Sequence, residues 1–119
     1  MVACHNVAEF LPACLDSLLA QEMPATQVIL VNDGSTDETG SICQRYAGAN
    51  EGWMVADGPG SGPGGARDIG LEHVTGEFLA FVDGDDVVPA EAFRVLLSCL
   101  RRTGSDMVSG DVMRYDGIH

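Results

Sequence analysis

The stretch FLAFVDGDD, residues 78–86, decides the expected fold. Residues 78–82 are apolar and, apart from one alanine, bulky or β-branched, which is typical of a strand buried on both faces of a sheet. The run stops at three carboxylates, Asp83, Asp85 and Asp86, which are therefore gathered at one strand end. Because like charges held this close repel one another, a fold that ionises all three needs a cation or hydrogen-bond donors among them.

A divalent metal ion is the simplest way to satisfy this acidic cluster. All-oxygen ligands suit Mg²⁺ or Mn²⁺, and such an ion commonly shares its open coordination positions with phosphate. The alternative is a solvated acidic turn that binds nothing. A calcium-binding EF-hand loop is excluded, because Val87 occupies the third ligand position and no glycine follows it.

Composition limits the classes of partner. The chain has 119 residues, enough for one domain, and a net charge of −12 with no lysine. That balance argues against nucleic acid or an anionic membrane surface as a partner. The four cysteines form no CxxC pair, which favours reduced core residues in a cytoplasmic protein. No apolar run is long enough to cross a bilayer and nothing resembles a signal peptide, so any contact with the inner membrane face is expected through regions outside this chain.

Strands and helices alternate along the chain. The expected strands are the first few residues, which look like the end of a strand, and residues 27–31, 53–56, 78–82 and about 107–113. The expected helices run from a cap at Asn6 to about Gln21, from a Ser35–Glu38 capping box to Gly48, over residues 66–73, and from Pro89 to Thr103. Residues 58–65, GPGSGPGG, are expected to be a flexible or tightly turned loop.

This alternation predicts an α/β fold with a mostly parallel sheet and helices on both faces. Ligands of such sheets bind beyond the carboxyl ends of the strands. Asn6, Asp33, the glycine segment 58–65 and the acidic cluster that begins at Asp83 all fall at that edge. The convergence of four separate segments is the main argument for a binding site.

Four motifs carry a family resemblance: HNVAEFLPACLDSLLAQ (residues 5–21), VILVNDGSTDETG (28–40), GGARDIGLEHVTGE (64–77) and FLAFVDGDD. In this order and spacing the sequence resembles the nucleotide-binding half of inverting family 2 glycosyltransferases, which have the GT-A fold. The resemblance covers nearly the whole chain, residues 1–119. It implies transfer of a sugar from a nucleotide-diphosphate donor, UDP-sugar being the favoured class, to the hydroxyl of a glycan, lipid or protein acceptor, with Mn²⁺ or Mg²⁺ at a DxD motif.

The resemblance also implies roles for the residues at the nucleotide end. His5 stands where the family commonly has tyrosine, next to Asn6, and its ring is expected to stack on the base; the alternative is a structural histidine. Asp33 is expected to accept a hydrogen bond from the base, or else to be a turn residue. Arg67 is expected to pair with the diphosphate or the base, against a surface ion pair with a neighbouring acid such as Asp68.

At the acidic end, the resemblance implies that Asp83 contacts the ribose and the metal ion and that Asp85 binds the metal ion. Asp86 is expected beside them or facing the sugar. The general base of the family lies in a later motif, beyond His119, so no aspartate of this chain is assigned to it. Because most of the first strand is absent, we expect a fragment or a mis-started reading frame with weak or no transferase activity by itself.

The sequence has three alternative interpretations besides an active glycosyltransferase. Gly60, Gly62 and Gly65 spell the GxGxxG of an NAD(P)-type dinucleotide-binding domain, with Asp83 at a suitable distance, although Pro63 stiffens the loop. A phosphoacceptor signalling domain needs a lysine, which this chain lacks. A catalytically inert donor-binding fragment would share the same site and lack only the base.

Overall fold

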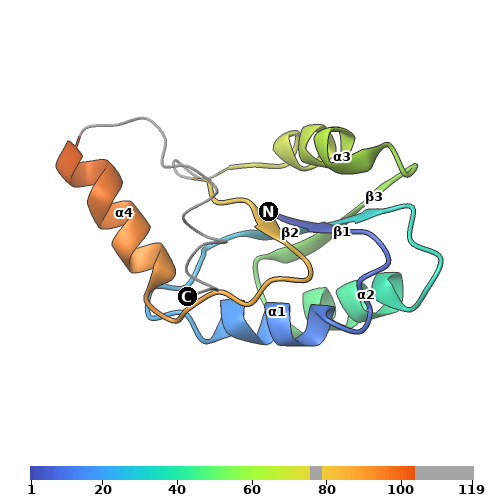
Figure 1. Cartoon of the computed structure of the whole chain (residues 1–119), viewed down its shortest axis with the longest axis horizontal. Coiled ribbons are helices and arrows are strands. Elements are labelled where there is room, and N and C mark those ends of the chain that lie inside the picture. Colours follow the sequence, from blue (N-terminus) through green and yellow to red (C-terminus); the bar gives the residue numbers. More distant parts are fainter. Residues whose placement is uncertain (76–78, 104–119) are drawn as a thin grey trace.

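The computed structural model describes residues 1–75 and 79–103 of the chain. These residues form, in chain order, β1 (Val2–Cys4), α1 (Leu11–Leu19), β2 (Val28–Asp33), α2 (Thr39–Ala49), β3 (Trp53–Gly58), α3 (Gly62–Leu71), β4 (Val82–Asp83) and α4 (Ala92–Thr103). The strands pair in parallel in the order β3-β2-β1-β4. Helices α1 and α2 cover one face of the sheet and α3 covers the other (Figure 1). The predicted α/β architecture is therefore confirmed.

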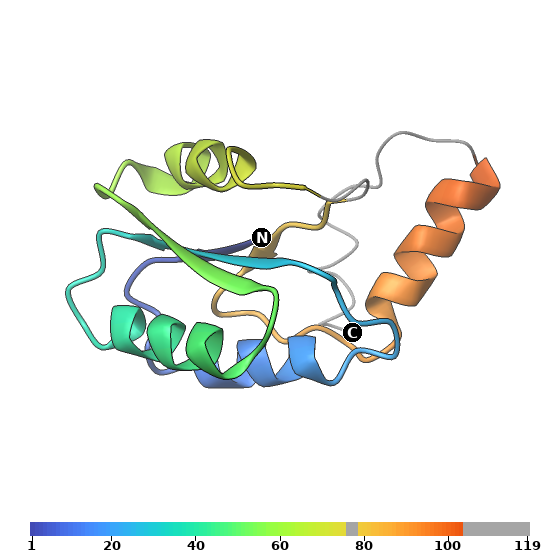
Figure 2. The ribbon, with the colours of Figure 1, turned by 180° about the vertical axis from the view of Figure 1, so that it is seen from behind.

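Strand β2 explains why both faces of the sheet are apolar. Val28 and Leu30 pack into a core with α1 and α2, while Ile29 and Val31 pack on the other face with Ala66 of α3. Successive side chains of a strand point to opposite faces, so a strand covered on both sides needs apolar residues at every position. The view from behind shows β2 crossing between the two helical layers (Figure 2).

The first two predicted helix starts are wrong. Helix α1 begins at Leu11 rather than after Asn6, and Asn6 itself has a positive φ of 49°. The Asn6 carboxamide oxygen instead accepts the backbone N–H of Thr36 at 2.8 Å, and the Asn6 N–H donates to the Ser35 hydroxyl. Helix α2 consequently begins at Thr39 with no capping box, because Ser35 is engaged with the neighbouring loop.

The glycine segment is also different from its prediction. Helix α3 begins at Gly62, inside the stretch expected to be a loop, and it ends at Leu71 rather than at residue 73. Pro63 lies in its first turn, where the missing N–H of proline has no consequence. The helix starts early because the Asp33 side chain of β2 accepts a hydrogen bond from the N–H of Gly62.

The strand predicted over residues 78–82 is shorter than expected. Strand β4 covers only Val82–Asp83, since it pairs with two residues of β1, Val2 and Ala3. Leu79 lies outside the ladder and is 38% exposed, which contradicts burial on both faces. Phe78 and the strand predicted over residues 107–113 lie outside the described residues.

Helix α4 begins three residues later than predicted, at Ala92, and ends at Thr103 as expected. Pro89 precedes it in a turn that is closed by a hydrogen bond from the Ala92 N–H to the Pro89 carbonyl. In the pictures α4 projects away from the end of the sheet (Figures 1 and 2).

Cys4, Cys14 and Cys43 are buried free thiols, and Cys99 on α4 is half-buried. Burial, followed by the charges of Asp86, Asp85 and Asp83, raises the pKa of Cys14 to about 12. A hydrogen bond with Cys43, together with burial, raises the pKa of Cys4. The Cys4 and Cys14 thiols are therefore poor nucleophiles in the folded protein.

We expect thiol labelling to divide the cysteines into two classes. At pH 8 a pKa near 12 leaves about one Cys14 side chain in ten thousand as thiolate. Cys99 should react with an aromatic disulfide reagent in the native protein, and the buried thiols should react only after urea unfolding. Mass spectrometry of the labelled peptides measures this. Rapid labelling of Cys14 in the folded chain would contradict the packing described here.

The core of β2 gives a second prediction. Leu30 is fully buried between β2 and the α1–α2 layer, so Leu30→Ala should lower the free energy of unfolding by about 2–5 kcal/mol. The matched control is Leu19→Ala on α1, where the side chain is 46% exposed and the expected loss is about 0.5 kcal/mol or less. Urea unfolding followed by circular dichroism measures both; equal losses would contradict the fold.

Candidate functional site

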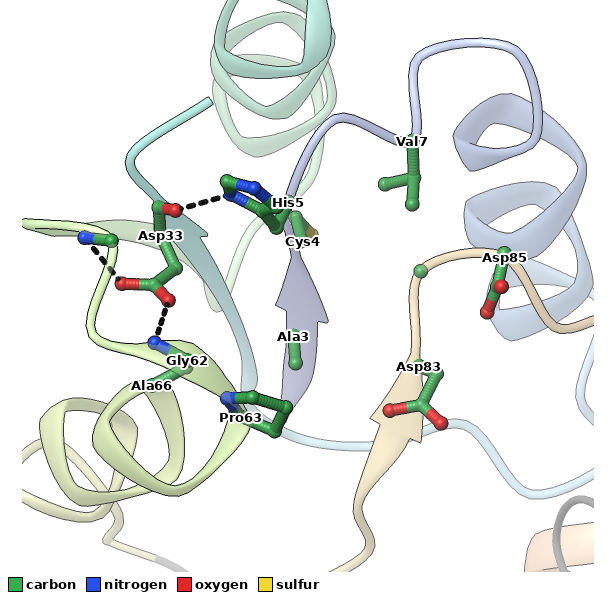
Figure 3. A pocket seen from close by; sticks show the side chains of 12 residues that line it. Ala3, Cys4, His5, Val7, Asp33, Gly62, Pro63, Ala66, Asp83 and Asp85 are labelled. Carbon is green, nitrogen blue, oxygen red and sulfur yellow. Dashed lines mark hydrogen bonds between the residues drawn. The ribbon is translucent and has the colours of Figure 1, made fainter. Parts of the chain in front are cut away.

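A cavity of about 350 Å³ opens beyond the carboxyl ends of β1, β2 and β4 (Figure 3). It is lined by Ala3, Cys4, His5, Val7, Asp33, Gly60, Gly62, Pro63, Ala66, Asp83, Gly84 and Asp85. This is the edge of a parallel sheet where ligands bind. Of the residues predicted from the sequence, the lining includes His5, Asp33, Asp83 and Asp85.

The acidic cluster stands at one side of this cavity. Asp83, Asp85 and Asp86 each offer a carboxylate oxygen, and these oxygens lie within 4.8 Å of one another. A turn brings them together, because the Asp86 N–H donates to the Asp83 carbonyl at 3.0 Å. Gly84 lies within this turn, and a Cβ at this position would come within 2.9 Å of the Val7 side chain.

Three carboxylates in this arrangement match a hard divalent cation. Their ligand atoms are all oxygen, and their mutual repulsion is relieved when positive charge sits among them. The same repulsion is felt by the buried Cys14 thiol, whose pKa the three carboxylates help to raise. The residues therefore fit a hard divalent ion such as Mg²⁺ or Mn²⁺.

Asp33 stands across the cavity at the end of β2. Its side chain is buried, with 3% exposed, and both carboxylate oxygens are engaged. Oδ1 accepts the N–H groups of Gly60 and Ser61 at 2.9 and 3.1 Å, and Oδ2 accepts the N–H of Gly62 at 2.9 Å. This carboxylate draws the glycine segment into the first turn of α3, which explains the early start of that helix.

His5 is held by the backbone of the same residue. Its Nδ1 lies 2.7 Å from the carbonyl oxygen of Asp33 (Figure 3). A carbonyl oxygen only accepts hydrogen bonds, so Nδ1 carries a proton, and whenever the ring is neutral its lone pair lies on Nε2. The imidazole is thus fixed in one tautomer at the edge of the cavity.

Three of the predicted site residues do not line the cavity. Asn6 is engaged with the loop before α2, and Asp86 belongs to the acidic cluster without reaching the lining. Arg67 is exposed on α3, and its guanidinium carbon lies 4.8 Å from the centre of the Phe81 ring. This is a cation–π contact rather than the alternative ion pair with Asp68, and the expected pairing of Arg67 with the diphosphate or the base stays a prediction.

Some lining residues were missed by the sequence analysis. Ala3, Val7 and Gly84 also line the cavity, and Figure 3 shows Ala3 between Asp33 and Asp83. Their only signal in the sequence is small size near a strand end. Which small residue faces the cavity depends on the pairing of β1 with β4, and that pairing connects residues about 80 positions apart.

The dinucleotide-binding alternative finds no support at the glycine segment. In that fingerprint the loop amides and the helix N-terminus bind pyrophosphate. Here the amides of Gly60, Ser61 and Gly62 donate to Asp33. The anion that occupies this position is therefore a side chain of the protein.

Among residues 1–75 and 79–103, no helix has the length and apolar character needed to span a membrane.

Several known proteins are similar to this chain in sequence, and solved structures among them are also similar in fold. The Bacillus subtilis protein described as uncharacterized glycosyltransferase EpsJ is 35% identical over 108 residues, which are 91% of this chain and 31% of EpsJ. The structure of Staphylococcus aureus TarS 1–349 in complex with UDP is 30% identical, with a TM-score of 0.77 over 88% of this chain and 32% of that one. Mannosyltransferase PcManGT from Pyrobaculum calidifontis, in complex with GDP-Man and Mn²⁺, is 26% identical, with a TM-score of 0.77 over 83% of this chain and 30% of that one.

This chain thus spans about a third of the length of these relatives. The sequence model described as "Glycosyl transferase family 2" matches residues 1–118. The predicted resemblance is confirmed, and the chain belongs to glycosyl transferase family 2.

Proposed function

We propose that residues 1–119 are the donor-binding part of an inverting glycosyltransferase that takes its sugar from a nucleotide-diphosphate donor, UDP-sugar being the favoured class. One observation carries the proposal: the clustered carboxylates of Asp83 and Asp85 share a cavity with Asp33 and His5 at the carboxyl edge of the sheet. A nucleotide diphosphate needs a site with two unlike ends, one for the base and one for the charged phosphates. We assign His5 and Asp33 to the base and the acidic cluster, with its metal ion, to the phosphates.

Asp83 and Asp85 would hold Mn²⁺ or Mg²⁺, because they line the cavity and their oxygens converge. A bound divalent ion supplies charge neutralisation for the departing nucleoside diphosphate. In this proposal Asp83 also contacts the ribose, and Asp86 stands beside the metal ligands or faces the sugar. Support for a metal comes from the Mn²⁺ that accompanies PcManGT.

His5 and Asp33 would form the base end of the site, with Asn6 behind them holding the loop between β2 and α2. The exposed His5 ring offers a flat surface for stacking, and its fixed tautomer presents Nε2 as an acceptor. Arg67 stays in the proposal as a partner for the diphosphate or the base, provided that it leaves the Phe81 ring. Support for UDP as the nucleotide comes from the TarS complex, while the PcManGT complex contains GDP-Man.

The chemistry needs more than this cavity. An acceptor oxygen of a glycan, lipid or protein attacks the anomeric carbon from the side opposite the diphosphate, which inverts the configuration, and a carboxylate takes its proton. We propose that this base lies beyond His119, and Asp106, Asp111 and Asp116 are not assigned to it because they lie outside the described residues. The chain alone would therefore bind the donor and transfer its sugar weakly or not at all. The free thiols favour a cytoplasmic setting for this activity.

Titration calorimetry tests the site directly. UDP should bind the full chain in the presence of Mn²⁺, and binding should weaken at least about tenfold without the metal or with Asp85→Ala, because the phosphates would then face bare carboxylates. Asp57→Ala is the control: it removes an exposed carboxylate at the neighbouring strand end of β3, outside the cavity lining, and should leave UDP binding unchanged.

Two results would contradict the proposal. One is UDP affinity that is the same with and without Mn²⁺ and in Asp85→Ala. The other is metal-independent binding of NAD in place of UDP, which would favour the dinucleotide alternative despite the engaged loop amides.

A further inference from the structure

The side chain of Asp33 is held by several backbone groups at the edge of the cavity. One carboxylate accepts three consecutive backbone N–H groups, from Gly60, Ser61 and Gly62. Hydrogen bonds from backbone amides to an ionised carboxylate are stronger than hydrogen bonds between neutral groups. Because the donors are consecutive, the contact fixes the path of a whole segment rather than the position of one atom.

The surrounding glycines make room for this contact. At Gly34, which has a φ of 69°, a Cβ would come within 2.9 Å of the Gly60 backbone. At Gly58 a Cβ would come within 2.7 Å of Asp33 Oδ1 itself. Gly60 and Gly62 both have a φ of 90°, which L side chains rarely adopt. These glycines therefore allow residues 58–62 to pack directly against the Asp33 carboxylate.

The carboxylate also serves the start of α3. Ser61 is the residue before the helix and makes no side-chain cap, so the first amides of α3 lack a local partner. Asp33 supplies that partner from β2, and its negative charge is favourable beside the helix N-terminus. The position that could attract a ligand phosphate is filled, which leaves the diphosphate to the acidic side of the cavity.

We propose that Asp33 is a positioning residue that holds residues 60–62 as a fixed wall of the nucleotide site. Gly60 and Gly62 line the cavity, so moving this segment changes its shape. The proposal rests on the function proposed above and narrows the role of Asp33 there: its effect on the nucleotide passes through the segment that it holds.

Two substitutions and two measurements test this. Amide exchange by NMR on the full chain reports the segment without any ligand, and calorimetry with UDP and Mn²⁺ reports the site. In Asp33→Ala the amides of residues 60–62 should exchange at least about tenfold faster, while those of β2 and β3 stay protected. UDP affinity should fall by at least about tenfold, and binding of Mn²⁺ alone should be unchanged, because its ligands stand across the cavity.

Asp33→Asn separates positioning from general stability. Its carboxamide oxygen can still accept from Gly60 and Ser61, but its NH₂ group cannot accept from Gly62. We therefore expect protection to remain at the first two amides and to be lost at Gly62, with an intermediate loss of UDP affinity. A general destabilisation would instead speed exchange throughout the chain. This variant also keeps the test usable if Asp33→Ala does not fold, and Asp57→Ala serves as the control.

The outcomes distinguish the two proposals. Unchanged exchange at residues 60–62 in Asp33→Ala, with UDP still bound in the presence of Mn²⁺, would overturn the positioning role and leave the proposed function standing. Faster exchange with unchanged UDP affinity would overturn the claim that the segment is a wall of the site. Faster exchange in a protein that never binds UDP would support the hold of Asp33 on the segment and overturn the proposed function.

Discussion

The parallel pairing of β1 with both β2 and β4 is the constraint on which the site depends. Val2 lies opposite Leu30 on one side and Val82 on the other, so the ends of β2 and β4 reach the same edge. Asp33 and Asp83 are 50 positions apart in the chain, yet they face one cavity across the short strand β1 (Figure 3). A slip of one residue in either pairing would turn one of these carboxylates to the other face of the sheet.

The two sides of the cavity treat negative charge in opposite ways. On one side the Asp33 carboxylate accepts hydrogen bonds from three amides of the protein's own backbone. On the other side Asp83, Asp85 and Asp86 are brought within reach of one another, where their repulsion favours a cation from solution. We propose that the first arrangement shapes the cavity and that the second gives it affinity for a cation.

The sequence predicted those features that depend on strand identity and on where strands end. The apolar run of β2, the acidic cluster after β4 and the parallel layered architecture were all readable, because each has a local pattern. The features that failed depend on contacts distant in sequence. Asn6 and Ser35 looked like helix caps, yet they bind each other's loops. The glycine segment looked irregular because the Asp33 contact that makes it helical comes from another strand.

In the proposed function, charge explains why the acidic cluster rather than the glycine segment would receive the phosphates. The chain carries a net charge of −12, and among residues 1–75 and 79–103 no arginine or lysine lines the cavity. Arg67 is the described arginine that the sequence placed at the site, and it lies over the Phe81 ring. A dianionic pyrophosphate entering such a cavity meets carboxylates on both sides, which is repulsive at any separation shorter than the screening length of about 8 Å. We therefore propose that positive charge enters with the ligand and that the converging oxygens of Asp83 and Asp85 accept it.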